Sequence, residues 1–128
     1  MKIIFADETE IEVKTIYGMS QRIQNADRDV LIIEIDPNIA DTEQLRDIFT
    51  DKNKTRRIRT STIIEEDESI SDVGNDYTLY LSVSNERREV HNTPGEINAP
   101  EWEIINIVKI AQLTYMEKMI ETLLSDNN

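Results

Sequence analysis

Cysteine is absent from this 128-residue chain, and histidine, glycine and proline occur only one, three and three times. The missing cysteines exclude disulfide frameworks and cysteine-based zinc sites. The three glycines stand alone at positions 18, 74 and 95, which excludes phosphate-binding glycine-rich loops and the nucleophile turn of serine hydrolases. The single histidine, His91, cannot form a His–His metal motif, and no acidic stretch has the spacing of a calcium-binding loop. We therefore expect no enzyme activity, no cofactor and no metal site.

Long hydrophobic runs are missing as well. No segment approaches the ~18 consecutive apolar residues of a membrane-spanning helix. The apolar run at 3–6 is too short for a signal peptide and is followed at once by acidic residues. Aromatic residues make up only 5% of the chain, so the core should be aliphatic. These absences predict one soluble, cytosolic domain.

Acidic residues are in excess, giving a net charge of −12. Residues 1–62 hold 12 acids and 10 bases, whereas residues 63–128 hold 14 acids and 4 bases. Acidic surfaces repel phosphate backbones, so direct nucleic-acid binding is not expected. Two interpretations of the acidity stay open: it keeps the protein soluble, or it mimics a polyanion.

Hydrophobic periodicity predicts a mainly antiparallel sheet. Alternation over residues 2–6 and 9–17, with a turn at Asp7 and Glu8, indicates a hairpin. The apolar, β-branched run Val30–Ile35 indicates a central strand. Residues 18–29 are polar and are interpreted as a loop. Asp41 begins a short helix, with Gln44 completing a capping box.

The C-terminal region predicts a long helix. Pro100 suits a first helical turn, and no glycine or proline follows up to Leu124. Helical spacing defines a first apolar stripe of Ile104, Ile107, Val108, Ala111 and Tyr115. A second stripe with coiled-coil spacing comprises Leu113, Met116, Ile120 and Leu123, with Met119 between the two stripes. Two interpretations stay open. Either the two stripes form one wide apolar face that is buried within the monomer, or the second stripe is an interface with another chain.

A basic cluster over residues 52–59 is the unusual local feature. It comprises Lys52, Lys54, Arg56, Arg57 and Arg59. It could contact phosphate or an acidic partner surface. Alternatively, its charge protects a strand edge from aggregation, or it pairs with the acidic run Glu65–Glu68 of the same chain.

Two stretches carry a family resemblance. Residues 1–15 (MKIIFADETEIEVKT) resemble the opening of small structural proteins from the tail gene regions of Gram-positive siphophages and prophages. Residues 42–59 (TEQLRDIFTDKNKTRRIR) are similar to a helix with a Leu-x-x-x-Phe pattern and a following basic strand in the same proteins. The resemblance implies a non-catalytic protein of the host cytoplasm, with association with the virion left open, and a terminal helix that bears heptads.

Together these observations predict an α+β fold with an antiparallel sheet of five or six strands, one short helix and a long C-terminal helix. Residues 1–98 would form the sheet domain and residues 99–126 the helix. The expected function is that of a tail- or baseplate-associated structural protein that forms a homo-oligomer, dimer or trimer, or binds other phage structural proteins through that helix. The alternative is an acidic binding module, either an inhibitor or a nucleic-acid mimic. No membrane partner is expected.

Overall fold

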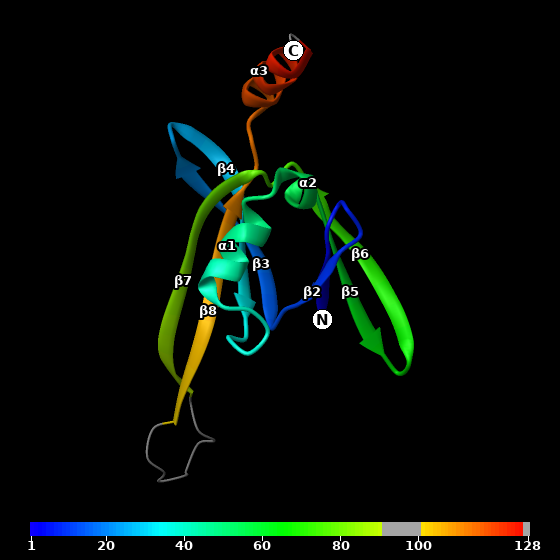
Figure 1. The fold of residues 1–128 in the computed structure, drawn as a ribbon, viewed down its shortest axis with the longest axis vertical. Coiled ribbons are helices and arrows are strands. Elements are labelled where there is room, and N and C mark those ends of the chain that lie inside the picture. The colour runs from blue at the N-terminus through cyan, green and yellow to red at the C-terminus, as the bar shows by residue number, and fades with distance from the viewer. Residues whose placement is uncertain (91–100, 127–128) are drawn as a thin grey trace.

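The computed structural model describes residues 1–90 and 101–126. Over these residues the chain forms eight strands and three short helices, and the strands build two four-stranded antiparallel sheets (Figure 1). The elements are β1 Lys2–Ile4, β2 Glu10–Glu12, β3 Thr15–Ile23, β4 Ala26–Ile35, α1 Thr42–Phe49, α2 Lys52–Thr55, β5 Arg57–Ile64, β6 Asp67–Asn75, β7 Leu79–Val90, β8 Glu101–Ala111 and α3 Tyr115–Asp126.

The first sheet has the order β2-β1-β5-β6. The predicted N-terminal hairpin is confirmed for β1 and β2, which pair with each other, and β1 pairs with β5 on its other side. The predicted second arm is wrong beyond Glu12, because residues 15–17 belong to β3 of the second sheet. β5 and β6 form a hairpin that projects from the body (Figure 1). Its turn consists of Glu65 and Glu66, whose φ angles of 51° and 71° are those of a two-residue hairpin turn.

The second sheet has the order β3-β4-β8-β7. The predicted central strand is confirmed, since Val30–Ile35 lies within β4 and pairs with both β3 and β8. The loop predicted over residues 18–29 is wrong. Those residues are the ends of β3 and β4 and the turn at Gln24 and Asn25, where φ is again positive. β3 is an edge strand with much of its surface in water, so its sequence lacks the apolar alternation that predicts a strand.

One hydrophobic core joins the two sheets and α1. Ile3 and Ile58 of the first sheet and Ile33 of the second are fully buried in it. From α1 come Leu45 and Phe49, and the Phe49 ring meets Phe5 edge-on with the ring centroids 5.4 Å apart. The core is therefore mainly aliphatic, as the composition predicts.

The capping box predicted for α1 is confirmed. The Asp41 side chain accepts a hydrogen bond of 2.8 Å from the Gln44 backbone, and the Gln44 side chain accepts one of 2.9 Å from the Asp41 backbone. Both partners lie within one helical turn, so the local sequence is sufficient to determine this geometry.

The prediction of a long C-terminal helix is wrong. The predicted five or six strands and two helices are also wrong, because the described residues form eight strands and three helices. Residues 101–111 form β8, a central strand between β4 and β7, and only Tyr115–Asp126 is helical. The run of isoleucine and valine favours a strand. Because both faces of a central strand are covered, its apolar residues need not alternate and can match helical spacing by chance. The predicted stripe of Ile104, Ile107, Val108, Ala111 and Tyr115 is therefore not one face.

Glu103 lies within the segment predicted as a helix but belongs to a strand. It lies on β8 and, with Arg88, Glu34 and Lys14, forms a network of charges on the second sheet. Arg88 donates to Glu34, and to Glu103 over 2.6 Å, while Lys14 donates to Glu103 over 2.7 Å. Hydrogen bonds from Arg88 lower the pKa of Glu34, and those from Lys14 and then Arg88 lower the pKa of Glu103. The network links β4, β7 and β8 to Lys14, the residue that precedes β3.

Some predictions lie outside the described residues. These are the connector over 93–98, the domain boundary at 98, the placement of Pro100 in a first helical turn and the surface position of His91.

Candidate functional site

The start of α3 is fixed by a second capping box. Glu117 lies three residues after Thr114, and its carboxylate accepts a hydrogen bond of 2.8 Å from the Thr114 backbone. In return the Thr114 hydroxyl accepts one of 3.2 Å from the Glu117 backbone. This pairing satisfies donors that a helix N-terminus otherwise leaves free. The helix therefore begins at Tyr115, after a three-residue connection from the end of β8 at Ala111.

A buried arginine attaches α3 to the sheet. Arg28 of β4 is only 4% exposed and donates to both carboxylate oxygens of Glu117, over 3.0 Å from Nη2. The Arg28 guanidinium also donates hydrogen bonds to the backbone carbonyl oxygens of Ile23, over 3.0 Å, and Gln112, over 3.1 Å. The hydrogen bonds from Arg28, and then that from Thr114, lower the pKa of Glu117 to about 2. Arg28 thus links the β3–β4 hairpin to the first turn of α3.

The other charged side chains near the start and middle of α3 also contact the body. Lys118 forms an ion pair with Asp76 at 3.1 Å, and Glu121 forms one with Lys52 of α2 at 3.8 Å. With Glu117, these are all the charged residues between 115 and 124. On this helix the charged face is directed toward the protein.

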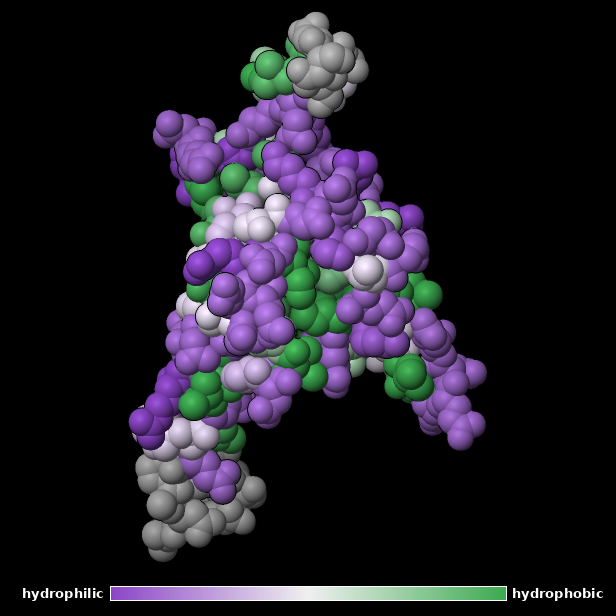
Figure 2. All heavy atoms as spheres, viewed as in Figure 1, coloured by the Kyte–Doolittle hydropathy of each residue, from purple (hydrophilic) through white to green (hydrophobic). Residues whose placement is uncertain are grey.

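The opposite face of α3 is apolar and lies in solvent. It consists of Met116, Met119, Ile120 and Leu123, with Tyr115 at its beginning, and we call these five residues the α3 seam. Their side chains are between 44% and 74% exposed. Figure 2 shows hydrophobic residues at this projecting end of the molecule. A surface helix normally has the reverse arrangement, with its apolar face on the core and its charges in water.

Four of the five predicted interface residues lie together on the α3 seam. Leu113, the fifth, precedes α3 and lines a cleft on the body side of the helix. Sequence reasoning placed Tyr115 in the other stripe and did not single out Arg28. The Thr114–Glu117 capping box was visible in the sequence and would have located the helix start.

The structure does not gather the basic cluster into one free surface. Lys54 binds Asp7 at 2.7 Å, and this hydrogen bond is the main reason that the pKa of Asp7 falls to about 2. Arg59 binds Glu8 at 2.7 Å. Arg57 lies 3.4 Å from Asp72, which is a longer ion pair. Three of the five basic residues are therefore paired with acidic residues of the same chain.

The two remaining members of the cluster, Lys52 and Arg56, line the cleft behind α3. Lys52 has the long pair with Glu121, whereas Arg56 has no ion pair within residues 1–90 and 101–126. The acidic run Glu65–Glu68 is not the partner of the cluster: the pairs that Arg57 and Arg59 make are with Asp72 and Glu8.

The described part of the chain contains no group of three or more acidic, histidine or cysteine side chains placed to hold a metal ion. It also contains no helix with the length and apolar character needed to cross a bilayer. The chain matches no family model, no curated protein and no solved structure.

Proposed function

We propose that this chain is a non-catalytic structural protein that assembles with a second copy of itself through the α3 seam. The observation that carries this proposal is the reversed orientation of α3, whose charges pair with the body while its apolar side chains face water. Exposed apolar clusters of this kind are typical of association surfaces. Burial of five large apolar side chains would supply a favourable free energy of roughly 1.5–3 kcal/mol for each side chain that becomes fully buried.

A second copy of this chain is the partner that suits the α3 seam. In a symmetric pairing each face meets an identical face, so any charge on it would be placed against a like charge. The seam has none, and Met116, Ile120 and Leu123 have the spacing of a helix–helix seam. Tyr115, Met119 and Leu123 also line a shallow groove of about 330 Å³, which can accept side chains from the partner helix.

The attribution to a phage or prophage tail or baseplate rests on the resemblance of residues 1–15 and 42–59 alone. A self-associating, non-catalytic protein is compatible with that setting. The assembly proposal itself depends only on α3 and can be tested without the attribution.

Replacement of Ile120 by Asp should separate the subunits. We expect the light-scattering mass at tens of micromolar to fall to 14.9 kDa, because a charge would be buried in the seam. Ile39→Asp is the matched control, since Ile39 is 43% exposed, Ile120 is 54% exposed, and Ile39 lies away from α3. Far-ultraviolet circular dichroism checks that both variants fold. Equal masses for the two variants would contradict the proposal.

Disulfide trapping tests whether the partner is a second copy. The chain has no cysteine, so Met119→Cys introduces a single thiol on the seam. A symmetric helix pair brings the two thiols together, and oxidation should then yield covalent dimers much faster than it does for Ile39→Cys. Equal rates for both cysteine variants would show that the seam does not meet itself.

A further inference from the structure

The tip of the β5–β6 hairpin is a second surface without a partner. Glu65 and Glu66 form the turn, and Asp67 follows; none has an ion pair within the described residues. Glu68 accepts a hydrogen bond only from Ser61, at 3.0 Å. Beside these acids three isoleucines, Ile63, Ile64 and Ile70, are between 55% and 64% exposed. A turn that served solubility alone would not require exposed isoleucines next to it.

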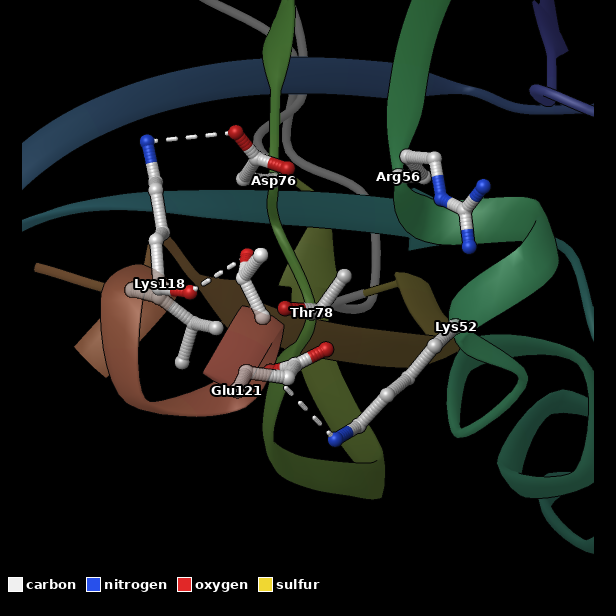
Figure 3. A pocket seen from close by; sticks show the side chains of 8 residues that line it. Lys52, Arg56, Asp76, Thr78, Lys118 and Glu121 are labelled. Atoms are coloured by element: carbon white, nitrogen blue, oxygen red, sulfur yellow. Dashed lines mark hydrogen bonds and ion pairs between the residues drawn. The ribbon is translucent and has the colours of Figure 1, made fainter. Parts of the chain in front are cut away.

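The cleft behind α3 has the opposite character. It has a volume of about 290 Å³ and lies between α2, the β6–β7 connection and α3 (Figure 3). Asp76 and Glu121 line it, but their charges are already paired with Lys118 and Lys52. Arg56 therefore remains as the unpaired charge, and Figure 3 shows its guanidinium with no interaction to the other residues drawn.

A buried hydroxyl in the same cleft also lacks a partner. Thr78 Oγ1 is inaccessible to solvent and has no hydrogen bond in the described structure. Because that hydroxyl is closed off, the donor that an incoming group meets in the cleft is the exposed guanidinium of Arg56. A carboxylate is a suitable ligand, because a guanidinium donates two parallel hydrogen bonds to it.

We propose that the acidic hairpin tip of one copy inserts into the cleft of another copy. Glu65 or Glu66 then accepts hydrogen bonds from Arg56, and the isoleucines beside the turn cover the rim of the cleft. The cleft volume of about 290 Å³ lies just below the range for small-molecule sites, ~300–1,000 Å³, and suits a few side chains. Charge complementarity selects this occupant: the tip has carboxylates without cations, and the cleft has a guanidinium without an anion.

The contact joins different surfaces of the two copies. In Figure 1 the tip points away from α2 and α3, so it does not lie against its own cleft. A head-to-tail contact of this kind generates a ring or a filament, whereas the α3 seam joins identical surfaces. The seam side chains do not form the ion pairs of the cleft, so the two contacts can be tested separately. The tip contact is small and should be weak alone, because stable interfaces bury ~1,200–2,000 Å².

Disulfide trapping between two different cysteine variants tests the inference. Both chains also have Ile120→Asp, which prevents association through the α3 seam. One chain receives Glu65→Cys and the other Thr122→Cys, at an exposed, uncharged position that lines the cleft. Glu66, Arg56 and the Lys52–Glu121 pair stay intact. We expect mixed covalent dimers to form several-fold faster than with the control chain Arg22→Cys, which places the thiol at the exposed end of β3. Intact mass distinguishes mixed dimers from homodimers.

A charge exchange completes the experiment. Arg56→Glu in the Thr122→Cys chain should reduce trapping to the control rate, and adding Glu66→Arg to the Glu65→Cys chain should restore it. Circular dichroism confirms that each chain folds. Trapping at the control rate from the start, or trapping that persists with Arg56→Glu alone, would overturn the inference. Neither result depends on whether the α3 seam associates.

Discussion

At the scale of single residues, Arg28 has the greatest influence on the arrangement of the candidate site. It contacts Glu117, which is 89 positions away in the chain, and two backbone carbonyls. The sequence could not predict this role, because Arg28 stands in a polar stretch interpreted as a loop and its partners are brought near it only by the fold. The Asp41–Gln44 capping box could be predicted, because its two members are three residues apart.

Replacement of Arg28 by Met should destabilise the protein by about 2 kcal/mol, since hydrogen bonds from a charged group contribute roughly 1.5–3 kcal/mol. Urea denaturation measures the change. Arg22→Met is the control: Arg22 is exposed, its contact with Asp27 is 3.4 Å long, and its loss should change the free energy of unfolding by less than about 0.5 kcal/mol. Equal effects of the two substitutions would show that Arg28 does not anchor α3.

The lowered pKa of Glu117 predicts a dependence of stability on pH. Its carboxyl has a pKa of about 2 in the folded protein and 4.5 ordinarily, so the charged form favours folding. This contribution is complete above pH 4.5 and is lost as the pH falls toward 2. Asp7 behaves in the same way, so the wild-type protein should lose stability from both groups over this range.

The variant Glu117→Gln measures how much Glu117 contributes to this pH dependence of stability. The variant should be less stable than wild type at pH 7 and should lose less stability between pH 5 and pH 2, because it has one titrating group fewer. Urea midpoints at several pH values give both quantities. Parallel stability curves for the two proteins would contradict the assigned pairing.

At the scale of elements, the sequence predicted the first half of the fold better than the second. β1, β2, the centre of β4, α1 and β5 have local patterns that match their burial. β8 does not, because a strand covered on both faces has apolar residues at almost every position and its neighbours are distant in sequence. Helical spacing was therefore a coincidence of the run Ile104–Ile110.

Two alanine substitutions distinguish the strand from the helix. Ile110 lay outside the predicted helical stripe but is fully buried in β8, so Ile110→Ala should cost ~2–5 kcal/mol. Ile104 belonged to that stripe but is 56% exposed, so Ile104→Ala should cost less than about 0.5 kcal/mol. Thermal or urea unfolding measures both. A larger cost at Ile104 than at Ile110 would contradict the strand.

At the scale of the whole molecule, the chain combines a net charge of −12 with an uncharged apolar surface at one end. The charge keeps copies apart at long range, whereas the α3 seam favours their contact at short range. Four residues of this surface could be predicted from their spacing. That they face water could not, because the sequence does not show that Arg28, Asp76 and Lys52 hold the charged side of α3 against the body.

The central claim is that the α3 seam joins copies of this chain. Sedimentation equilibrium of the wild-type protein over a concentration series tests it most directly, because association follows mass action. We expect a mass that rises with concentration from 14.9 kDa toward twice that value by tens of micromolar. A mass of 14.9 kDa throughout the series would contradict it.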